Sequence, residues 1–173
     1  FWIEKIHGRD GFRWVNPVHE VLEYTGEIPR KMVSVKGVQL NHHADNSKPR
    51  TQYLPLLEMA VEENPNNDRN VHYLGREYMF HGMWEQCINM LERHLEMPEA
   101  TWKDERCASM RFIGKSYYQL GNPEEAKRYF YLAMAEAPHL REPYIDLANM
   151  LYMREEWNGA IYFIEEALKI KVR

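Results

Sequence analysis

Apolar and small residues recur at helical spacing along the second half of the chain, most regularly between Cys107 and Leu140. Their positions predict two amphipathic helices joined by a short turn, because apolar side chains three and four residues apart share one helix face. Gly121 is expected to end the first helix, Asn122 to cap the second, and Pro123 to occupy its first turn. The segment therefore predicts one complete helix-turn-helix unit.

The same pattern recurs on both sides of this unit. Counted from Cys107 as position 1, the characteristic small, aromatic and turn positions hold Ile113, Gly114, Tyr117, Gly121, Ala126, Phe130, Ala133 and Pro138. These positions resemble those of the tetratricopeptide repeat, which has a period of 34 residues. A looser copy follows from Arg141, with Glu155 in place of the turn glycine, and an earlier copy opens at Asp68. From Asp68 to Cys107 the interval is 39 residues, five more than one period.

The repeats set the expected fold class and domain organisation. Leu57, Ala60 and Pro65 match the second half of a repeat and predict a leading helix. The chain is expected to be mainly α, a tetratricopeptide-type α-α superhelix of three full repeats plus that helix, with a small N-terminal β-rich segment. We expect a β-rich region over residues 1–50 and a repeat domain over residues 51–173.

The first fifty residues contain short runs with strand character. Aromatic and branched residues fill Phe1–Ile6 and Phe12–Val15, with the turn sequence Gly8-Arg-Asp-Gly11 between them, which predicts a hairpin. Further strands are expected at Val18–Leu22 and Met32–Leu40. Because the chain begins without Met inside a strand-like run, we expect it to be a fragment of a longer protein.

Composition narrows the class of protein. The chain has 173 residues, 45% of them hydrophobic, with a net charge of −4 and two cysteines. It has enough apolar residues for a real core, and its acidic balance gives no reason to expect nucleic-acid binding. Two cysteines are too few for a disulfide framework, and no apolar run approaches the ~18 residues of a membrane span. We therefore expect a cytoplasmic protein with no nucleic-acid partner and no membrane span.

Stretches along nearly the whole chain resemble one enzyme family. They are Lys5–Leu22, Leu40-Asn-His-His43, Leu74–Tyr78, His94–Pro98, Thr101–Arg106 and Arg141–Pro143. They resemble bacterial family-two glycosyltransferases of the GT-A type that continue into tetratricopeptide repeats. The resemblance implies the C-terminal part of such an enzyme, whose repeats bind a protein or glycan acceptor. The missing N-terminal half would bind the nucleotide sugar, with Mn²⁺ or Mg²⁺ as its divalent metal.

The chain lacks the parts of that family that carry the chemistry. It contains no Asp-x-Asp pair to hold a metal against a diphosphate, and no glycine-rich phosphate loop that opens a helix. The fragment alone is therefore predicted to be inactive and to have no cofactor. The alternative is a stand-alone, non-enzymatic protein-interaction module. A metal-binding regulator that uses His19, His42 and His43 is a third reading, for which metal in the purified chain is the discriminating observation.

Candidate site residues in the β-rich region lie near the ends of the expected strands. The resemblance places His19 and Glu20 at the rim of the enzyme's active site, and the neighbours Arg13 and Trp14 are suited to stacking on a sugar or base. The candidate metal ligands are His19 and His43, since imidazole suits a divalent ion. The alternative is that the histidines are bonded locally and that Trp14 packs beside a solvated Arg13.

The repeats predict a second kind of site. In this fold the concave surface is lined by positions 2, 5, 9 and 12 of each first helix. The candidate partner-binding residues there are Arg69, His72, Arg76, Arg111, Lys115, Tyr118, Asn149 and Tyr152. This predicts a basic groove that reads carboxylates or phosphates, unless these are ordinary solvated helix faces paired with acids. Ile161, Ile164 and Leu168 form an apolar stripe on the last helix. It predicts either self-association or a place where more protein was removed.

Overall fold

The computed structural model describes residues 7–8, 10–16, 18, 20–29, 31, 33, 37, 41, 43 and 52–171. Its contacts divide the chain into two compact units, Phe1–Ala60 and Val61–Arg173, and the second is called the helical unit below. Seven helices and two strands lie in the described part of the chain. None of these helices is long and apolar enough to cross a bilayer.

The first unit contains a small antiparallel hairpin. Strand β1 (Phe12–Val15) pairs with β2 (Val21–Tyr24), so that Phe12 faces Tyr24 and Val15 faces Val21. The aromatic rings of Phe12 and Tyr24 have centroids 4.9 Å apart, a cross-strand contact that fixes the register. The loop between the strands begins at Asn16, which has the left-handed φ of 71°.

The predicted strands are only partly recovered. Phe12–Val15 is confirmed, whereas the strand predicted at Val18–Leu22 begins at Val21 instead. The reason is that Val18 is buried within the hairpin loop, so its apolar character serves loop packing and not the ladder. Phe1–Ile6 lies outside the described residues, as does most of Met32–Leu40.

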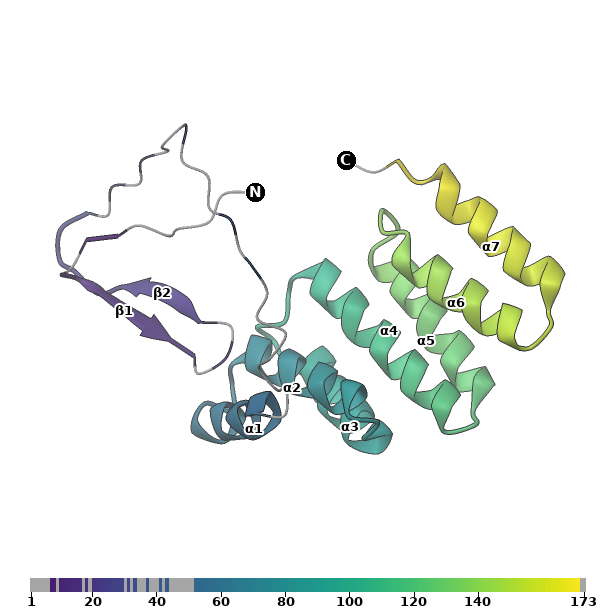
Figure 1. Ribbon diagram of the computed structural model, residues 1–173, viewed down its shortest axis with the longest axis horizontal. Helices are drawn as coiled ribbons and strands as arrows, with labels where there is room; N and C mark the ends of the chain where they lie inside the picture. Colours follow the sequence, from purple (N-terminus) through teal and green to yellow (C-terminus); the bar gives the residue numbers. More distant parts are fainter. Residues whose placement is uncertain are drawn as a thin grey trace. The chain divides into compact units, whose positions relative to one another are not determined.

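The helices follow the predicted repeats. After α1 (Tyr53–Glu63), the three pairs are α2 (Asp68–Phe80) with α3 (Trp84–Glu96), α4 (Lys103–Gln119) with α5 (Pro123–Glu136), and α6 (Glu142–Met153) with α7 (Trp157–Lys169). Figure 1 shows the pairs of the helical unit following one another in chain order. The expected fold class, a mainly α tetratricopeptide-type superhelix with a leading helix and a small N-terminal sheet, is confirmed.

The first helix of every repeat ends in the same way. Position 15 takes a left-handed φ in all three repeats, 71° at Gly82, 77° at Gly121 and 62° at Glu155. The next residue then donates its amide to the carbonyl oxygen at position 11, at 2.9 Å each time: Met83 to Tyr78, Asn122 to Tyr117 and Glu156 to Leu151. These bonds satisfy carbonyl groups that a helix end would otherwise leave unpaired.

In the first two repeats, a glycine of the first helix meets a large apolar side chain of the second, as the sequence predicts. A Cβ at Gly114 would lie 2.8 Å from Cε1 of Phe130, closer than a real Cβ contact. Gly75 lies equally tightly against Leu91. Glycine is therefore required at position 8 of these repeats to bring the two helix axes together.

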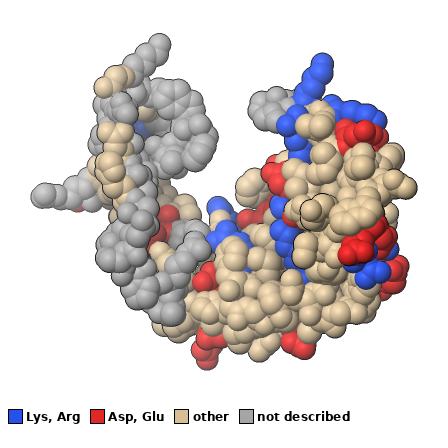
Figure 2. Space-filling model, turned by 45° about the vertical axis from the view of Figure 1, so that its right-hand side comes forward, with Lys and Arg blue, Asp and Glu red and all other residues tan. Residues whose placement is uncertain are grey.

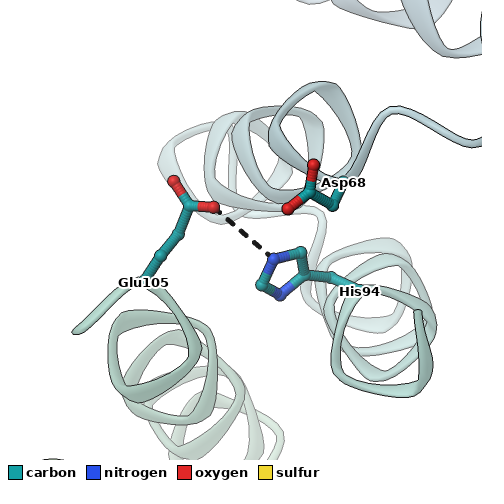
Figure 3. Close-up of side chains that lie close together, drawn as sticks. All are labelled: Asp68, His94 and Glu105. Carbon is teal, nitrogen blue, oxygen red and sulfur yellow. Dashed lines mark ion pairs between the residues drawn. The ribbon is translucent and has the colours of Figure 1, made fainter. Parts of the chain in front are cut away.

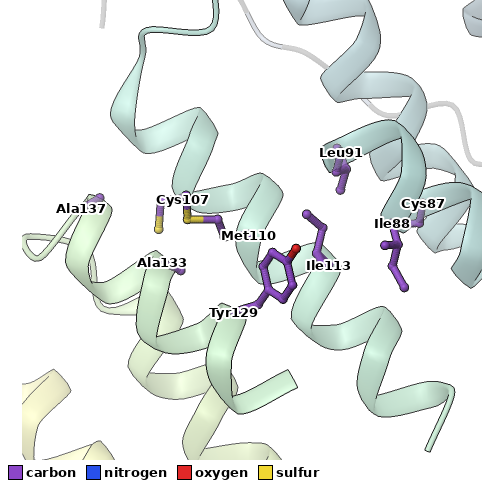
Figure 4. Packing of buried hydrophobic residues seen from close by; sticks show 9 residues of the cluster. All are labelled: Cys87, Ile88, Leu91, Cys107, Met110, Ile113, Tyr129, Ala133 and Ala137. Atoms are coloured by element: carbon purple, nitrogen blue, oxygen red, sulfur yellow. The ribbon is translucent and has the colours of Figure 1, made fainter. Parts of the chain in front are cut away.

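Two apolar clusters hold the repeats together. The first joins α3, α4 and α5 and is drawn in Figure 4; its residues are Cys87, Ile88, Leu91, Cys107, Met110, Ile113, Tyr129, Ala133 and Ala137. The second joins α5, α6 and α7 and consists of Ala126, Phe130, Met134, Leu147, Met150, Leu151 and Ala160. Because each cluster spans a junction between repeats, no repeat buries its apolar face alone.

The five extra residues between the first and second repeats have a clear structural place. They form a longer loop and an additional turn at the start of α4, which begins at Lys103, four residues before Cys107. In that turn, Arg106 donates to the carbonyl oxygens of Leu95 at 2.9 Å and Ala100 at 3.2 Å. Its Nε also contacts the Glu136 carboxylate at 3.2 Å. The insertion is thereby fixed to α3 and α5.

Candidate partner-binding groove

The helical unit has a hollow of about 310 Å³ on the face formed by the first helices of the repeats. Its lining residues are Met79, Trp84, Lys115, Tyr118, Gln119, Phe130, Asp146, Asn149, Met150 and Met153. Three of the predicted groove residues, Lys115, Tyr118 and Asn149, lie together there. The periodicity explains why: Lys115 and Tyr118 are three residues apart on α4 and share one face, opposite Asn149 on α6.

The hollow is apolar at its base and polar at its edge. Phe130 and Met150 are buried, whereas Met153 is exposed and Tyr118 is half-buried. Methionine adapts its shape readily, and aromatic faces provide flat contact area. The exposed Asn149 amide adds a donor and an acceptor beside this apolar surface. The hollow therefore has the composition of a site for an apolar side chain held next to a polar backbone.

The charge of the groove differs from the prediction because of Asp146, which the position count did not include. Arg111 Nε lies 2.6 Å from Asp146 Oδ2, and Lys115 Nζ lies 2.9 Å from Asp146 Oδ1. Both cations thus share one nearly buried carboxylate, which leaves a formal charge of +1 on the three residues. In Figure 2, acidic and basic side chains are interspersed over the visible face of the helical unit. Asp146 therefore offsets part of the positive charge that the sequence predicts for the groove.

The predicted groove residues of α2, together with Tyr152 of α6, lie outside the hollow. Arg76 lies over the Tyr73 ring at 4.6 Å, and Arg69 donates to the Tyr73 hydroxyl at 3.0 Å. Tyr152 is exposed and makes an edge contact with Trp157, with ring centroids 5.1 Å apart. None of these residues, nor Arg111, lines the hollow.

His72 differs most clearly from the groove prediction, because it is only 4% exposed and does not face the groove. Its Nδ1 lies 2.8 Å from Ser109 Oγ, and the same hydroxyl lies 3.0 Å from His94 Nδ1. Burial lowers the pKa of His72 to about 4, despite the opposing attraction of Glu105. His72 is therefore neutral at neutral pH and belongs to a buried polar cluster.

Sequence reasoning missed this cluster, although one signal was present. His94 occupies position 27 of the first repeat, where the other repeats have Ala133 and Ala167. A large polar residue at a position otherwise held by alanine indicates a different local environment. The structure provides it: His94 is fully buried, and its Nε2 lies 3.7 Å from Glu105 Oε1.

The candidates of the first unit are only partly described. Arg13 forms an ion pair with Glu23 at 2.6 Å, directly across the hairpin. This contact favours the alternative in which Arg13 is a solvated side chain with no role in binding a sugar. Trp14 is 57% exposed, and Glu20 and His43 are exposed as well. His19 and His42 lie outside the described residues. The active-site rim and the metal site of His19 and His43 remain predictions.

Comparison with known proteins agrees with the architecture. A family model described as tetratricopeptide repeat matches residues 144–173. The fold is that of a tetratricopeptide repeat protein. No curated protein matches the chain.

Several solved structures share the repeat fold. MamA MSR-1 has a TM-score of 0.55 at 18% identity, over 69% of this chain and 66% of that one. Pseudomonas aeruginosa pilF has a TM-score of 0.57 at 17% identity, over 69% and 52%. Yeast Tom70 has a TM-score of 0.59 at 14% identity, over 72% and 25%. The chain thus spans less than two thirds of each of these proteins, and at such identities the likeness concerns the fold alone.

Proposed function

We propose that the helical unit is a protein-interaction module, and that its hollow binds a partner segment through one large apolar side chain. The observation that carries this proposal is the hollow itself, which lies on the face that the first helices of the repeats share. Hollows of this kind take up an anchor residue, while the surrounding polar groups set the direction of the bound chain.

The lining favours a peptide over a sugar. Met79, Met150 and Met153 give the hollow an adaptable apolar wall, whereas a sugar would require more convergent polar groups than Asn149 and Lys115 supply. Lys115 is the more exposed of the two cations bound to Asp146, so it keeps donors for a partner carboxylate. The preferred ligand is therefore a segment with a large apolar residue close to an acidic one.

A random-peptide display selection on the full chain, followed by calorimetry of the enriched peptides, tests this proposal. Met153→Glu should weaken the binding of the selected peptides about tenfold or more, because it places a charge in the apolar wall of the hollow. Met59→Glu is the matched control, since Met59 is also exposed but does not line the hollow. Equal loss in both variants, or no loss in Met153→Glu, contradicts the proposal.

The origin from a glycosyltransferase rests on the sequence resemblance, and neither the family match nor the structures named above supports it. The stand-alone interaction module fits them better. The two differ in the gene: an upstream open reading frame with a βαβ segment and an Asp-x-Asp pair would favour the enzyme origin. Both predict that calorimetric titration of the metal-saturated chain with UDP- and GDP-sugars gives no saturable heat, because the chain has no carboxylate pair of the Asp-x-Asp type. Micromolar binding of a nucleotide sugar would contradict the expectation that the missing half binds it.

A further inference from the structure

Three ends of helices meet at the junction of the first and second repeats. Asp68 is the first residue of α2, His94 lies in the last turn of α3, and Glu105 lies in the added first turn of α4. Figure 3 shows the three side chains pointing toward one another. One nitrogen or oxygen from each lies within 4.8 Å of the other two. His94 and Glu105 are buried, and Asp68 is partly exposed, so the cluster is reachable from solvent on the Asp68 side.

The His94 ring is aimed into this cluster without completing a hydrogen bond there. Its side chain is 1% exposed, and Nε2 has no hydrogen-bond partner. The nearest carboxylate oxygen, Glu105 Oε1, is 3.7 Å away, beyond normal hydrogen-bond length. A buried polar atom without a hydrogen bond lowers the stability of the fold by about 1–3 kcal/mol, which favours a ligand at this position.

The other ring nitrogen fixes the orientation of His94. Nδ1 contacts Ser109 Oγ, and Ser109 Oγ in turn contacts Nδ1 of the neutral His72. When His94 Nδ1–H donates to Ser109 and the Ser109 hydroxyl donates to His72, Nε2 carries a lone pair that faces two carboxylates. A lone pair among carboxylates is repulsive unless a proton or a metal ion lies between them. This is the usual arrangement behind a metal-bound histidine, whose second nitrogen donates to a neighbouring group.

We propose that Asp68, His94 and Glu105 form a binding site for a divalent transition-metal ion of the zinc type. Zinc bonds of about 2.0–2.2 Å to nitrogen and oxygen place tetrahedral ligand atoms roughly 3.3–3.6 Å apart. The 3.7 Å between His94 Nε2 and Glu105 Oε1 is close to that spacing. Asp68 supplies the third ligand atom, and water from the open side supplies the fourth. Two carboxylates also balance the charge of the ion.

The neighbouring charges are compatible with this assignment. Arg69 Nε lies 4.0 Å from Glu105 Oε2, the oxygen that does not face His94, and the Arg69 side chain is half exposed to solvent. Glu105 Oε1 therefore remains available to the ion. Ca²⁺ and Mg²⁺ prefer six or more oxygen ligands, whereas an imidazole with two carboxylates suits zinc and its neighbours. The ion would tie the ends of α2, α3 and α4 together at one point.

The test is equilibrium dialysis of the full chain, first treated with chelator, against ZnCl₂, with bound zinc measured by atomic emission. We expect one zinc ion per chain. Asp68→Asn, a substitution at a partly exposed position, should weaken binding about 10- to 100-fold, and Glu105→Gln should do the same. The circular dichroism of each variant checks that the helices are retained.

Asp104→Asn is the matched control. Asp104 precedes Glu105 in the same turn of α4 and contacts Nε2 of the exposed His139 at 2.9 Å, outside the proposed site. Its zinc affinity should equal that of the unmodified chain. Loss of zinc binding in Asp104→Asn, with zinc binding retained in Asp68→Asn, would place the ion at Asp104 and His139 and overturn the proposal.

A second readout guards against misfolding of a variant. Zinc should raise the melting temperature of the unmodified chain and of Asp104→Asn, because an ion that binds only the folded state stabilises it. It should leave the melting temperature of Asp68→Asn unchanged. Ser109→Ala should weaken zinc binding at least severalfold, since Ser109 orients His94 without being a ligand itself. Absence of zinc binding at about 100 μM contradicts the site. So does zinc affinity in Asp68→Asn and Glu105→Gln that equals the affinity of the unmodified chain.

Discussion

At the scale of single residues, the turns of the three repeats differ in one important way. Gly82 and Gly121 adopt a left-handed φ that glycine tolerates freely, whereas Glu155 adopts φ 62° with a side chain. A non-glycine residue in this region is strained by about 1–2 kcal/mol. The third repeat therefore stores strain that the others avoid.

Glu155→Gly should stabilise the chain by about 0.5–1 kcal/mol, because relief of the strained backbone exceeds the added entropy of the unfolded glycine. Urea unfolding followed by circular dichroism measures the change. Gly121→Ala is the reciprocal variant: no atom lies within 4 Å of its added Cβ, so its expected loss of about 1 kcal/mol comes from the backbone alone. A destabilised Glu155→Gly would show that the Glu155 side chain outweighs the strain.

The two cysteines allow a prediction about alkaline pH. Burial raises the pKa of Cys87 and of Cys107 to about 11, from a usual value of 9.0. Between pH 9 and 11 the unfolded thiols ionise while the folded ones stay protonated, so stability falls as pH rises through this window. Two pKa units correspond to at most about 2.7 kcal/mol for a thiol.

The variant Cys87→Ala isolates this effect, because alanine occupies the same repeat position at Ala126 and Ala160. Urea unfolding at pH 8 and pH 10.5 should show a smaller loss of stability in the variant than in the unmodified chain. Equal losses would mean that the buried Cys87 thiol does not contribute to the pH dependence.

At the scale of the elements, the contact between α4 and α5 leaves no room for a side chain at Gly114. Gly114→Leu should cost roughly 1–3 kcal/mol, because a Cβ alone already meets the Phe130 ring at 2.8 Å. Lys127→Ala, which removes weak contacts to Glu124 and Glu156, should cost within about 0.5 kcal/mol. Urea midpoints compare the two variants, and equal midpoints would contradict the repeat register.

The helices were predictable and the polar contacts were not, for a physical reason. A repeat constrains each position by its neighbours in the same unit, so Gly114, Gly121 and Asn122 reveal their roles locally. The partners of Asp146 and His94 lie on other repeats, and only the assembled fold shows them. His72 illustrates the difference, because its repeat position indicates the groove and its partner Ser109 places it in the interior.

At the scale of the whole molecule, the apolar stripe on α7 is exposed, as the sequence predicts. Ile161 is 57% exposed, Ile164 is 40% exposed and Leu168 is 69% exposed. Neighbouring apolar side chains of this size commonly mark a contact surface.

Light scattering should therefore show an average mass that rises with concentration up to about 100 μM. Leu168→Glu should reduce that rise without changing stability, because it adds a charge to the stripe at an exposed position. Tyr53→Glu, at a 40% exposed site on α1, is a control away from the stripe. A monomer at every concentration would show that α7 needs no partner copy.

Repeat proteins lengthen and shorten by duplicating or deleting whole repeats, which succeeds where successive junctions are interchangeable. Both junctions bury an apolar cluster, and the second adds the Asp146 ion pairs at the groove. The first junction also depends on the added turn of α4, which provides Glu105 beside His94 and Arg106 as a donor to the Leu95 carbonyl oxygen. A repeat inserted at that junction would separate these partners. Residues 68–140 are therefore expected to tolerate an inserted repeat less well than the second junction does.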